Sequence, residues 1–130
     1  MRDNLTIIKD SYAAGKEGNI PGMLSDLANN ATWTEIAGGP YGGTYTGQKD
    51  ILENVFGRIG KDWEWFACIP EEFYEAGDTV IMLGWYAGVH SQTKKEFKIR
   101  VAHVWQLADG KIIKFEQFTD SALMKAAMTD

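Results

Sequence analysis

Apolar residues in the first half of the chain recur every three or four positions, a spacing that predicts helices. Leu5, Ile8 and Tyr12 fall on one face of a first helix. A short second helix is expected to open at Asn19-Ile20-Pro21, because proline is tolerated in a first turn. A third begins at Thr46-Gly47. The expected buried residues are Met23, Leu24 and Leu27 for the second helix, and Ile51, Leu52, Val55, Phe56 and Ile59 for the third.

From residue 61 onward the period of the apolar residues changes to two, which predicts strands. Trp63, Trp65, Ala67 and Ile69 alternate with other residues in one run, and Asp109-Gly110 is a hairpin signal. The expected elements are a brief strand at Ala31–Ile36, a glycine-rich lip or turn at Gly38–Gly43, a strand in the run after Lys61, three strands at Thr79–Val89, Glu96–Leu107 and Lys111–Phe118, and a last helix at Ser121–Met128.

This order places three helices and one brief strand before four long strands in a meander. Helices segregated from an antiparallel sheet define the α+β class. A long meander must bury one face, and the helices are the only material that can cover it. Long strands also twist and curl. The expected fold is therefore a cone-shaped roll, in which a curved, mainly antiparallel sheet wraps over three N-terminal helices around a central pocket. No repeat or linker divides the chain, so residues 1–130 are expected to form one domain.

Composition and charge narrow the possible partners. The chain is 45% hydrophobic with a net charge of -5, and its 13 basic residues are spread out, which argues against nucleic acid. No apolar run reaches membrane-spanning length, and no basic leader precedes a hydrophobic segment. Cys68 is the single cysteine, so neither an internal disulfide nor a cysteine-rich metal site is expected. We expect a cytoplasmic protein in which Cys68 is an inert buried thiol, with a nucleophile as the alternative.

Four residues are candidates for acid–base chemistry in the pocket. His103 stands in an apolar row of the strand Glu96–Leu107, where it either satisfies a structural hydrogen bond or lines the pocket. Tyr12 shares the apolar face of the first helix, and core packing is its alternative role. Glu35 ends the brief strand and points to the pocket or to the lip. Asp120 follows the last strand and is either a base or the cap of the terminal helix.

Aromatic residues are the candidates for contacts with a ligand. Five tryptophans are many for 130 residues, and most of them are expected in the core. One or two can form walls for a flat, ring-shaped ligand. The residues expected to bind substrate are Trp33, Phe56, Trp63 and Trp105.

Short strings spread over the whole chain carry a family resemblance. They are Tyr12–Asn19, Asn30–Trp33, Gly43–Gly47 followed by Ile51, Val101–Trp105, Asp109–Ile112 and Phe118–Asp120. In this order and spacing they resemble the nuclear transport factor 2-like superfamily, and within it the SnoaL-like polyketide cyclases and the relatives of ketosteroid isomerase. Each string is weak alone, and the order of all of them is what favours this fold.

The resemblance implies roles for the four candidates. Tyr12 matches the tyrosine of the isomerase oxyanion hole, and His103 falls where the second oxyanion donor stands. Glu35 occupies the position of the isomerase base, although it is Glu rather than Asp. His103 and Asp120 also match the active pair of the cyclase branch. The departures at Glu35 and His103 argue against a true steroid isomerase.

Two hypotheses follow. The first is an enzyme that moves a proton on a hydrophobic carbonyl compound, with Asp120 or Glu35 as base and Tyr12 and His103 as donors to the enolate. It requires no cofactor and no metal. The second is a non-catalytic module that binds an apolar metabolite or serves as a dimerisation domain, since one fold hosts both kinds of function. A homodimer is expected under either hypothesis, through the outer sheet face that carries Lys98 and Arg100.

Overall fold

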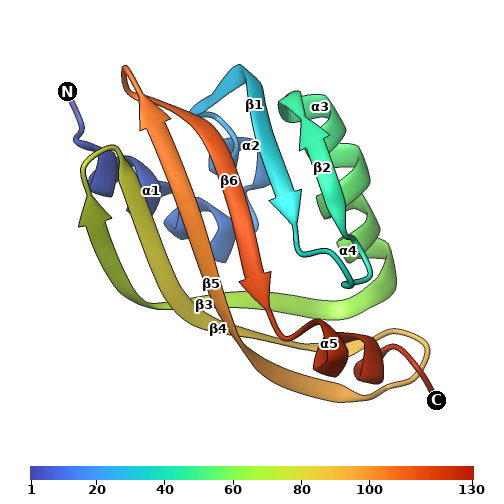
Figure 1. Ribbon diagram of the computed structural model, residues 1–130. Helices are drawn as coiled ribbons and strands as arrows, with labels where there is room; N and C mark the ends of the chain where they lie inside the picture. The colour runs from blue at the N-terminus through green and yellow to red at the C-terminus, as the bar shows by residue number, and fades with distance from the viewer.

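The computed structural model describes all residues 1–130, and its largest element is one curved sheet of six strands (Figure 1). The strand order is β2-β1-β6-β5-β4-β3. β1 runs parallel to β6, and every other neighbouring pair is antiparallel. The strands are β1 (Leu27–Glu35), β2 (Gly43–Thr46), β3 (Trp63–Ala76), β4 (Thr79–His90), β5 (Glu96–Ala108) and β6 (Lys111–Thr119).

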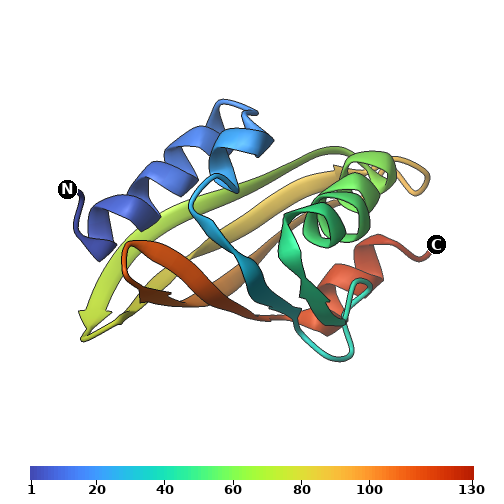
Figure 2. The same ribbon diagram turned by 90° about the horizontal axis from the view of Figure 1, so that it is seen from above.

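Three helical segments from the N-terminal half lie on one side of the sheet, as Figure 2 shows from above. They are α1 (Asn4–Lys16), α2 (Ile20–Met23) and a continuous segment made of α3 (Gly47–Ile51), the π-helical turn η1 (Leu52–Phe56) and α4 (Gly57–Asp62). This arrangement confirms the predicted α+β class and the curved sheet over N-terminal helices. No helix has both the length and the apolar character needed to cross a bilayer.

Polar side chains cap the N-terminal ends of α1 and α2. The carboxylate of Asp3 accepts a hydrogen bond from the backbone N–H of Thr6 at the start of α1. Asn19 accepts one from the N–H of Gly22 and so caps α2. The last helix, α5 (Ser121–Ala127), packs Met124 and Ala127 in the core at the end of the cone.

The core lies between the sheet and the helices. On β5 the residues of the predicted apolar row, His103 included, are buried, and the residues between them face outward or are only partly buried. This period of two matches the pleat of a strand with one covered face. The buried residues of the row are Ile99, Val101, His103, Trp105 and Leu107.

The alternation predicted for Trp63 to Ile69 is wrong at its start. The β3–β4 register shifts between Trp63 and Trp65, which marks a bulge. A bulge adds one residue to a strand and exchanges the two faces beyond it. Trp63 is therefore buried, whereas Trp65 is 51% and Ile69 45% exposed. The side chains that instead pack against the core after the bulge are Phe66 and Cys68.

Three further predictions need correction. The first strand is longer than expected, so Leu27 is buried as the first residue of β1 and not as part of the second helix. Residues 43–46, at the end of the glycine-rich segment, pair with β1 as the edge strand β2. Leu52 is exposed because the π turn widens the helix at that point and shifts its apolar stripe.

Candidate functional site

A line of hydrogen-bonded side chains runs through the core between α1 and the sheet. The hydroxyl of Tyr12 lies 2.6 Å from Nδ1 of His103, and the hydroxyl of Tyr86 lies 2.6 Å from Nε2 of the same ring. The indole N–H of Trp105 donates to the Tyr12 hydroxyl at 2.9 Å. One helix and two strands thus hold two phenols on opposite edges of one imidazole.

The line continues from Tyr86 to a carboxyl group. The amide nitrogen of Gln117 donates to the Tyr86 hydroxyl at 2.8 Å and to Oε1 of Glu35 at 3.2 Å. The indole N–H of Trp33 donates to Oε2 of Glu35 at 3.1 Å. The Glu35 carboxyl therefore has two N–H donors and no cation beside it. We call these seven side chains the buried network: Tyr12, Trp33, Glu35, Tyr86, His103, Trp105 and Gln117.

Strand pairing places Gln117 at the centre of the buried network. Gln117 of β6 is the direct partner of His103 of β5. The parallel pairing of β1 with β6 sets Thr34 beside Glu116, so Glu35 follows next to Gln117. The backbone N–H of Ile36 donates to the amide oxygen of Gln117 at 3.1 Å. This bond orients the amide, because its nitrogen must then face Tyr86 and Glu35.

Burial dominates the electrostatics of the buried network. It raises the pKa of Glu35, which is 4% exposed, to about 7, against the opposing effect of the two N–H donors. It lowers the pKa of His103 to about 3. It also raises the pKa of Tyr12 and Tyr86 well above the ordinary value. Near neutral pH the imidazole and both phenols are neutral, and Glu35 is poised between its two protonation states.

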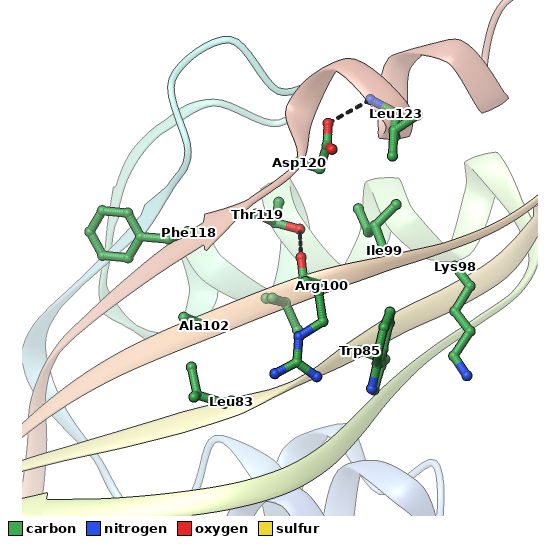
Figure 3. A pocket seen from close by; sticks show the side chains of 11 residues that line it. Leu83, Trp85, Lys98, Ile99, Arg100, Ala102, Phe118, Thr119, Asp120 and Leu123 are labelled. Atoms are coloured by element: carbon green, nitrogen blue, oxygen red, sulfur yellow. Dashed lines mark hydrogen bonds between the residues drawn. The ribbon is translucent and has the colours of Figure 1, made fainter.

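Asp120 lies outside the buried network. Its carboxylate accepts a hydrogen bond from the backbone N–H of Leu123 at 2.9 Å, which caps α5 (Figure 3). Its side chain lines a separate open groove of about 460 Å³, with Arg100, Phe118 and Leu123 among the other lining residues. The sequence left a cap and a base as alternatives for Asp120, and the structure places it as the cap. Glu35 is the carboxyl group that is joined to His103 and Tyr12, through Gln117 and Tyr86.

Comparison with known proteins identifies the family of the fold. The family model described as the SnoaL-like domain matches residues 8–115. The chain belongs to the SnoaL-like domain family. The resemblance read from the sequence strings is thereby confirmed at the level of family and fold. A comparison with proteins of curated function found no match.

Solved structures resemble this SnoaL-like domain over its full length. An NTF2-like protein from Burkholderia thailandensis is 43% identical, with a TM-score of 0.98 and complete coverage of both chains. An NTF2-like protein of unknown function from Burkholderia pseudomallei is 26% identical, with a TM-score of 0.92 and complete coverage of both. TerC, co-crystallised with polyporic acid, is 25% identical, with a TM-score of 0.89 and 98% of each chain covered.

The four aromatic residues expected to bind substrate fall into two groups in the SnoaL-like domain. Trp33, Phe56 and Trp105 belong to the core around the buried network, where Trp33 contacts the other two edge to face with ring centroids 5.5 Å apart. Trp63 lies in a second cluster, and its indole N–H donates to the hydroxyl of Tyr41 at 3.0 Å. In the first group, Trp105 donates a hydrogen bond to Tyr12 and Trp33 donates one to Glu35.

Tyr86 and Gln117 are the network residues that the sequence analysis missed. Neither belongs to a string that carries chemistry. Their positions in the alternating pattern of each strand could have identified them. Tyr86 lies on the inward face of β4 with Val80 and Met82, and Gln117 lies on the inward face of β6 with Phe115. A polar residue on an otherwise apolar inward face needs a partner, which is the argument that singled out His103.

The remaining candidates for reactive chemistry are few. Burial raises the pKa of the Cys68 thiol to about 12, which supports the inert role expected for it. No three His, Cys, Asp or Glu side chains are grouped so that they could hold a metal ion. The buried network itself combines hydrogen-bond donors and acceptors with one carboxyl group, Glu35, whose raised pKa lies near neutrality.

Proposed function

We propose that this SnoaL-like domain catalyses cofactor-independent proton transfer on a small, hydrophobic carbonyl compound, with Glu35 as the base and Tyr12 as a donor to the carbonyl oxygen. The observation that carries the proposal is the burial of the Glu35 carboxyl group within the network and its raised pKa. A buried carboxyl whose pKa is raised to about 7, in the same hydrogen-bonded group as two phenols, has the basicity of a general base at neutral pH.

The proposed step moves one proton and needs no redox change. The Glu35 carboxylate removes a proton from the carbon next to the carbonyl, and the electron pair of that C–H bond forms the enolate. The enolate oxygen accepts a hydrogen bond from Tyr12, and the Glu35 carboxylic acid then returns its proton to a carbon of the product. A preorganised donor at such an oxygen is worth about 3–4 kcal/mol in favourable cases.

The surroundings of Tyr12 and Glu35 favour an apolar ligand. Trp33, Trp105 and Phe56 supply aromatic surface around the buried network. Tyr12 is the half-buried member of the network and lies against Phe73, a half-buried residue of β3. The co-crystal of TerC with polyporic acid supports a small organic molecule as the ligand of this relative, and we extend that class of ligand to the present chain.

Hydrogen exchange on a ketone tests the proposal directly. 2-Tetralone, an aromatic ketone with acidic C–H bonds beside its carbonyl, is incubated with the protein in D2O, and loss of those proton signals is followed by NMR. We expect exchange faster than with buffer alone, and a decrease of at least 100-fold for Glu35→Gln. Glu116→Gln is the matched control, because Glu116 is next to Gln117 in the chain but its side chain is outside the buried network. Equal exchange by Glu35→Gln and wild type would contradict the role of Glu35.

The alternative function is a non-catalytic module that binds an apolar metabolite. One observation favours it: every buried side-chain nitrogen and oxygen has at least one hydrogen-bond partner within the protein, so the network can serve as a structural element. Under this alternative 2-tetralone or a related ketone binds, for example by a change in tryptophan fluorescence, but exchange stays at the rate of buffer and Glu35→Gln binds as tightly as wild type.

A homodimer in the cytoplasm completes the proposal. Trp85, Lys98 and Arg100 lie on the outer face of the sheet, with the Lys98 amine and the Arg100 guanidinium 4.8 and 4.7 Å from the centre of the Trp85 ring. Phe118 and Leu123, 45% and 53% exposed, add apolar surface beside them. Apolar surface interspersed with charge supports a contact between two copies of the chain. The cytoplasm is proposed from the single cysteine.

A further inference from the structure

The hydrogens of the buried network do not match its acceptors. A neutral imidazole carries one N–H donor and one acceptor nitrogen, yet His103 has a phenol at each nitrogen. One tyrosine must therefore donate its hydroxyl hydrogen to His103, and the other must accept the ring hydrogen. The accepting oxygen also receives an N–H, from Trp105 at Tyr12 or from Gln117 at Tyr86. Its own hydroxyl hydrogen is then left without an acceptor in the network.

The position of the ring hydrogen decides which tyrosine has the spare hydrogen. With the hydrogen on Nε2, His103 donates to Tyr86, Tyr12 donates to Nδ1, and the spare hydrogen belongs to Tyr86. With the hydrogen on Nδ1, His103 donates to Tyr12, Tyr86 donates to Nε2, and the spare hydrogen belongs to Tyr12. The two states contain the same hydrogens, and all three rings are neutral in both.

Burial distinguishes the two states. Tyr86, on the inward face of β4, is 6% exposed, whereas Tyr12 of α1 is half-buried. A buried O–H without an acceptor costs about 1–3 kcal/mol. A ligand or water oxygen can relieve this cost more readily at the half-buried Tyr12 than at the buried Tyr86.

We propose that His103 carries its ring hydrogen on Nδ1 and acts as a positioning residue, which frees the hydroxyl hydrogen of Tyr12 for one carbonyl or enolate oxygen of a ligand. The inference rests on the site of the proposed function. It gives His103 a different role from the one that the family resemblance implied, because the imidazole does not touch the ligand. It also adds Tyr86 and Gln117 as residues that act through His103.

NMR of the imidazole nitrogens tests the inference in the protein without any ligand. Protein labelled with 15N-histidine gives two sets of signals, and His90→Gln assigns the remaining set to His103. We expect a pyrrole-type Nδ1 and a pyridine-type Nε2. We expect Tyr12→Phe to exchange the two types, because Nδ1–H then loses its acceptor while Tyr86 can accept from Nε2–H. Tyr74→Phe, at an exposed tyrosine outside the network, is expected to leave both unchanged.

A carbonyl probe tests the role of Tyr12. The 13C signal of carbonyl-labelled 2-tetralone is expected to shift on binding to wild type, and its affinity to fall about tenfold for Tyr12→Phe, which corresponds to one lost hydrogen bond. His103→Gln, whose amide can accept from one phenol and donate to the other, is expected to keep most of the shift, and His103→Phe to lose it. These results separate a positioning role from simple packing.

The two proposals fail on different measurements. A hydrogen on Nε2 of His103, or on both nitrogens, at neutral pH overturns the inference, as does the absence of a Tyr12-dependent shift of the probe. Neither result affects Glu35-dependent exchange, which tests Glu35 as the base, although the absence of a Tyr12-dependent shift would also remove Tyr12 as the donor in the proposed function. Conversely, a hydrogen on Nδ1 with a Tyr12-dependent shift but no exchange supports the inference for a binding site and contradicts the enzyme.

Discussion

The carboxyl group of Glu35 and the imidazole of His103 are joined through Gln117 and Tyr86, and burial moves their pKa values in opposite directions. Glu35 is raised to about 7, and His103 is lowered to about 3. Ordinary values are about 4.5 for Glu35 and 6.5 for His103. Between pH 4.5 and pH 6.5 the unfolded chain therefore holds a proton on His103, and the folded chain holds one on Glu35. Folding therefore transfers a proton between the two sites without a net change in number, so their pH dependences cancel in this range.

Glu35→Gln is expected to reveal the dependence that comes from His103. The raised pKa of Glu35 stabilises the fold fully below about pH 4.5, and this stability is lost as the pH rises through about 7. In Glu35→Gln this contribution is absent. The free energy of unfolding of the variant should therefore increase with pH, relative to wild type, by roughly 2–3 kcal/mol between pH 4.5 and 6.5. Urea unfolding at the two pH values measures the difference. Glu116→Gln should instead follow wild type, and a Glu35→Gln curve parallel to wild type would contradict the raised pKa.

His103→Gln is expected to have the opposite effect. The lowered pKa of His103 keeps the imidazole neutral in the fold, and the associated stability is lost as the pH falls from about 6.5 toward 3. The variant should therefore lose stability with rising pH, relative to wild type, by roughly 2–3 kcal/mol between pH 4.5 and 6.5. The double variant Glu35→Gln/His103→Gln should again match the pH dependence of wild type. Urea unfolding of all four proteins completes the cycle.

Tyr12→Phe is expected to destabilise the fold although it removes one oxygen atom. The Trp105 N–H loses its acceptor, and Nδ1 of His103 loses its partner. Buried groups left without a partner cost about 1–3 kcal/mol. Thermal and urea unfolding measure the loss, with Tyr74→Phe as the exposed control. A loss no greater than that of the control would indicate that water replaces the hydroxyl.

The parts of the site that follow a simple period were predictable from the sequence. The row that contains His103 is regular along β5, and Tyr12 lies on the helix face that the spacing of Leu5 and Ile8 defines. The contact between Tyr12 and His103 follows from the general rule that helices cover the inner face of a curved sheet. Glu35 was a candidate because it ends a strand, and its burial was one of two alternatives left open.

Irregular features of the strands and helices could not be predicted from the spacing of apolar residues. The bulge after Trp63 exchanges the inward and outward faces of β3. No residue type at that position predicts a bulge. The π turn at Leu52 has the same effect on a helix stripe. Gln117 meets Glu35 only because β1 pairs in parallel with β6, a contact between segments more than 80 positions apart. Such long-range pairing depends on the packing of the whole sheet and not on local spacing.

Gly84→Ala is expected to be one of the most damaging small substitutions in the sheet. A Cβ at this position would overlap the backbone oxygen of Ile69 on β3 and would lie 2.9 Å from the sulfur of Met82. The β3–β4 pair must separate to admit it, so we expect a loss of at least about 2 kcal/mol. Gly60→Ala is the control, because a Cβ there meets nothing within 4 Å and alanine favours the helix. Thermal unfolding should show a lower Tm for the first and an unchanged or higher Tm for the second.

Phe118→Lys is expected to weaken the proposed homodimer. Phe118 presents its side chain on the outer face of β6, so a two-fold contact would bury it twice. A charge at both copies should raise the dimer dissociation constant at least tenfold. Size-exclusion chromatography with light scattering over a range of concentrations measures this, with Leu52→Lys on the helical side as control. A wild-type chain that stays monomeric at all concentrations would rule out the dimer.

The buried network also depends on the last strand of the chain to be synthesised. Tyr12 contacts His103 across 91 positions and Trp105 across 93, and Gln117 lies later still in β6. A ribosome-bound chain that ends before β6 contains Tyr12 and Glu35 but lacks the amide that connects them. In such a chain β1 would also lack β6, the strand that connects it to the rest of the sheet. Glu35 can therefore join Tyr86 only after Gln117 has been synthesised, and proteolytic removal of β6 from the finished chain would separate the carboxyl group from the two phenols and the imidazole.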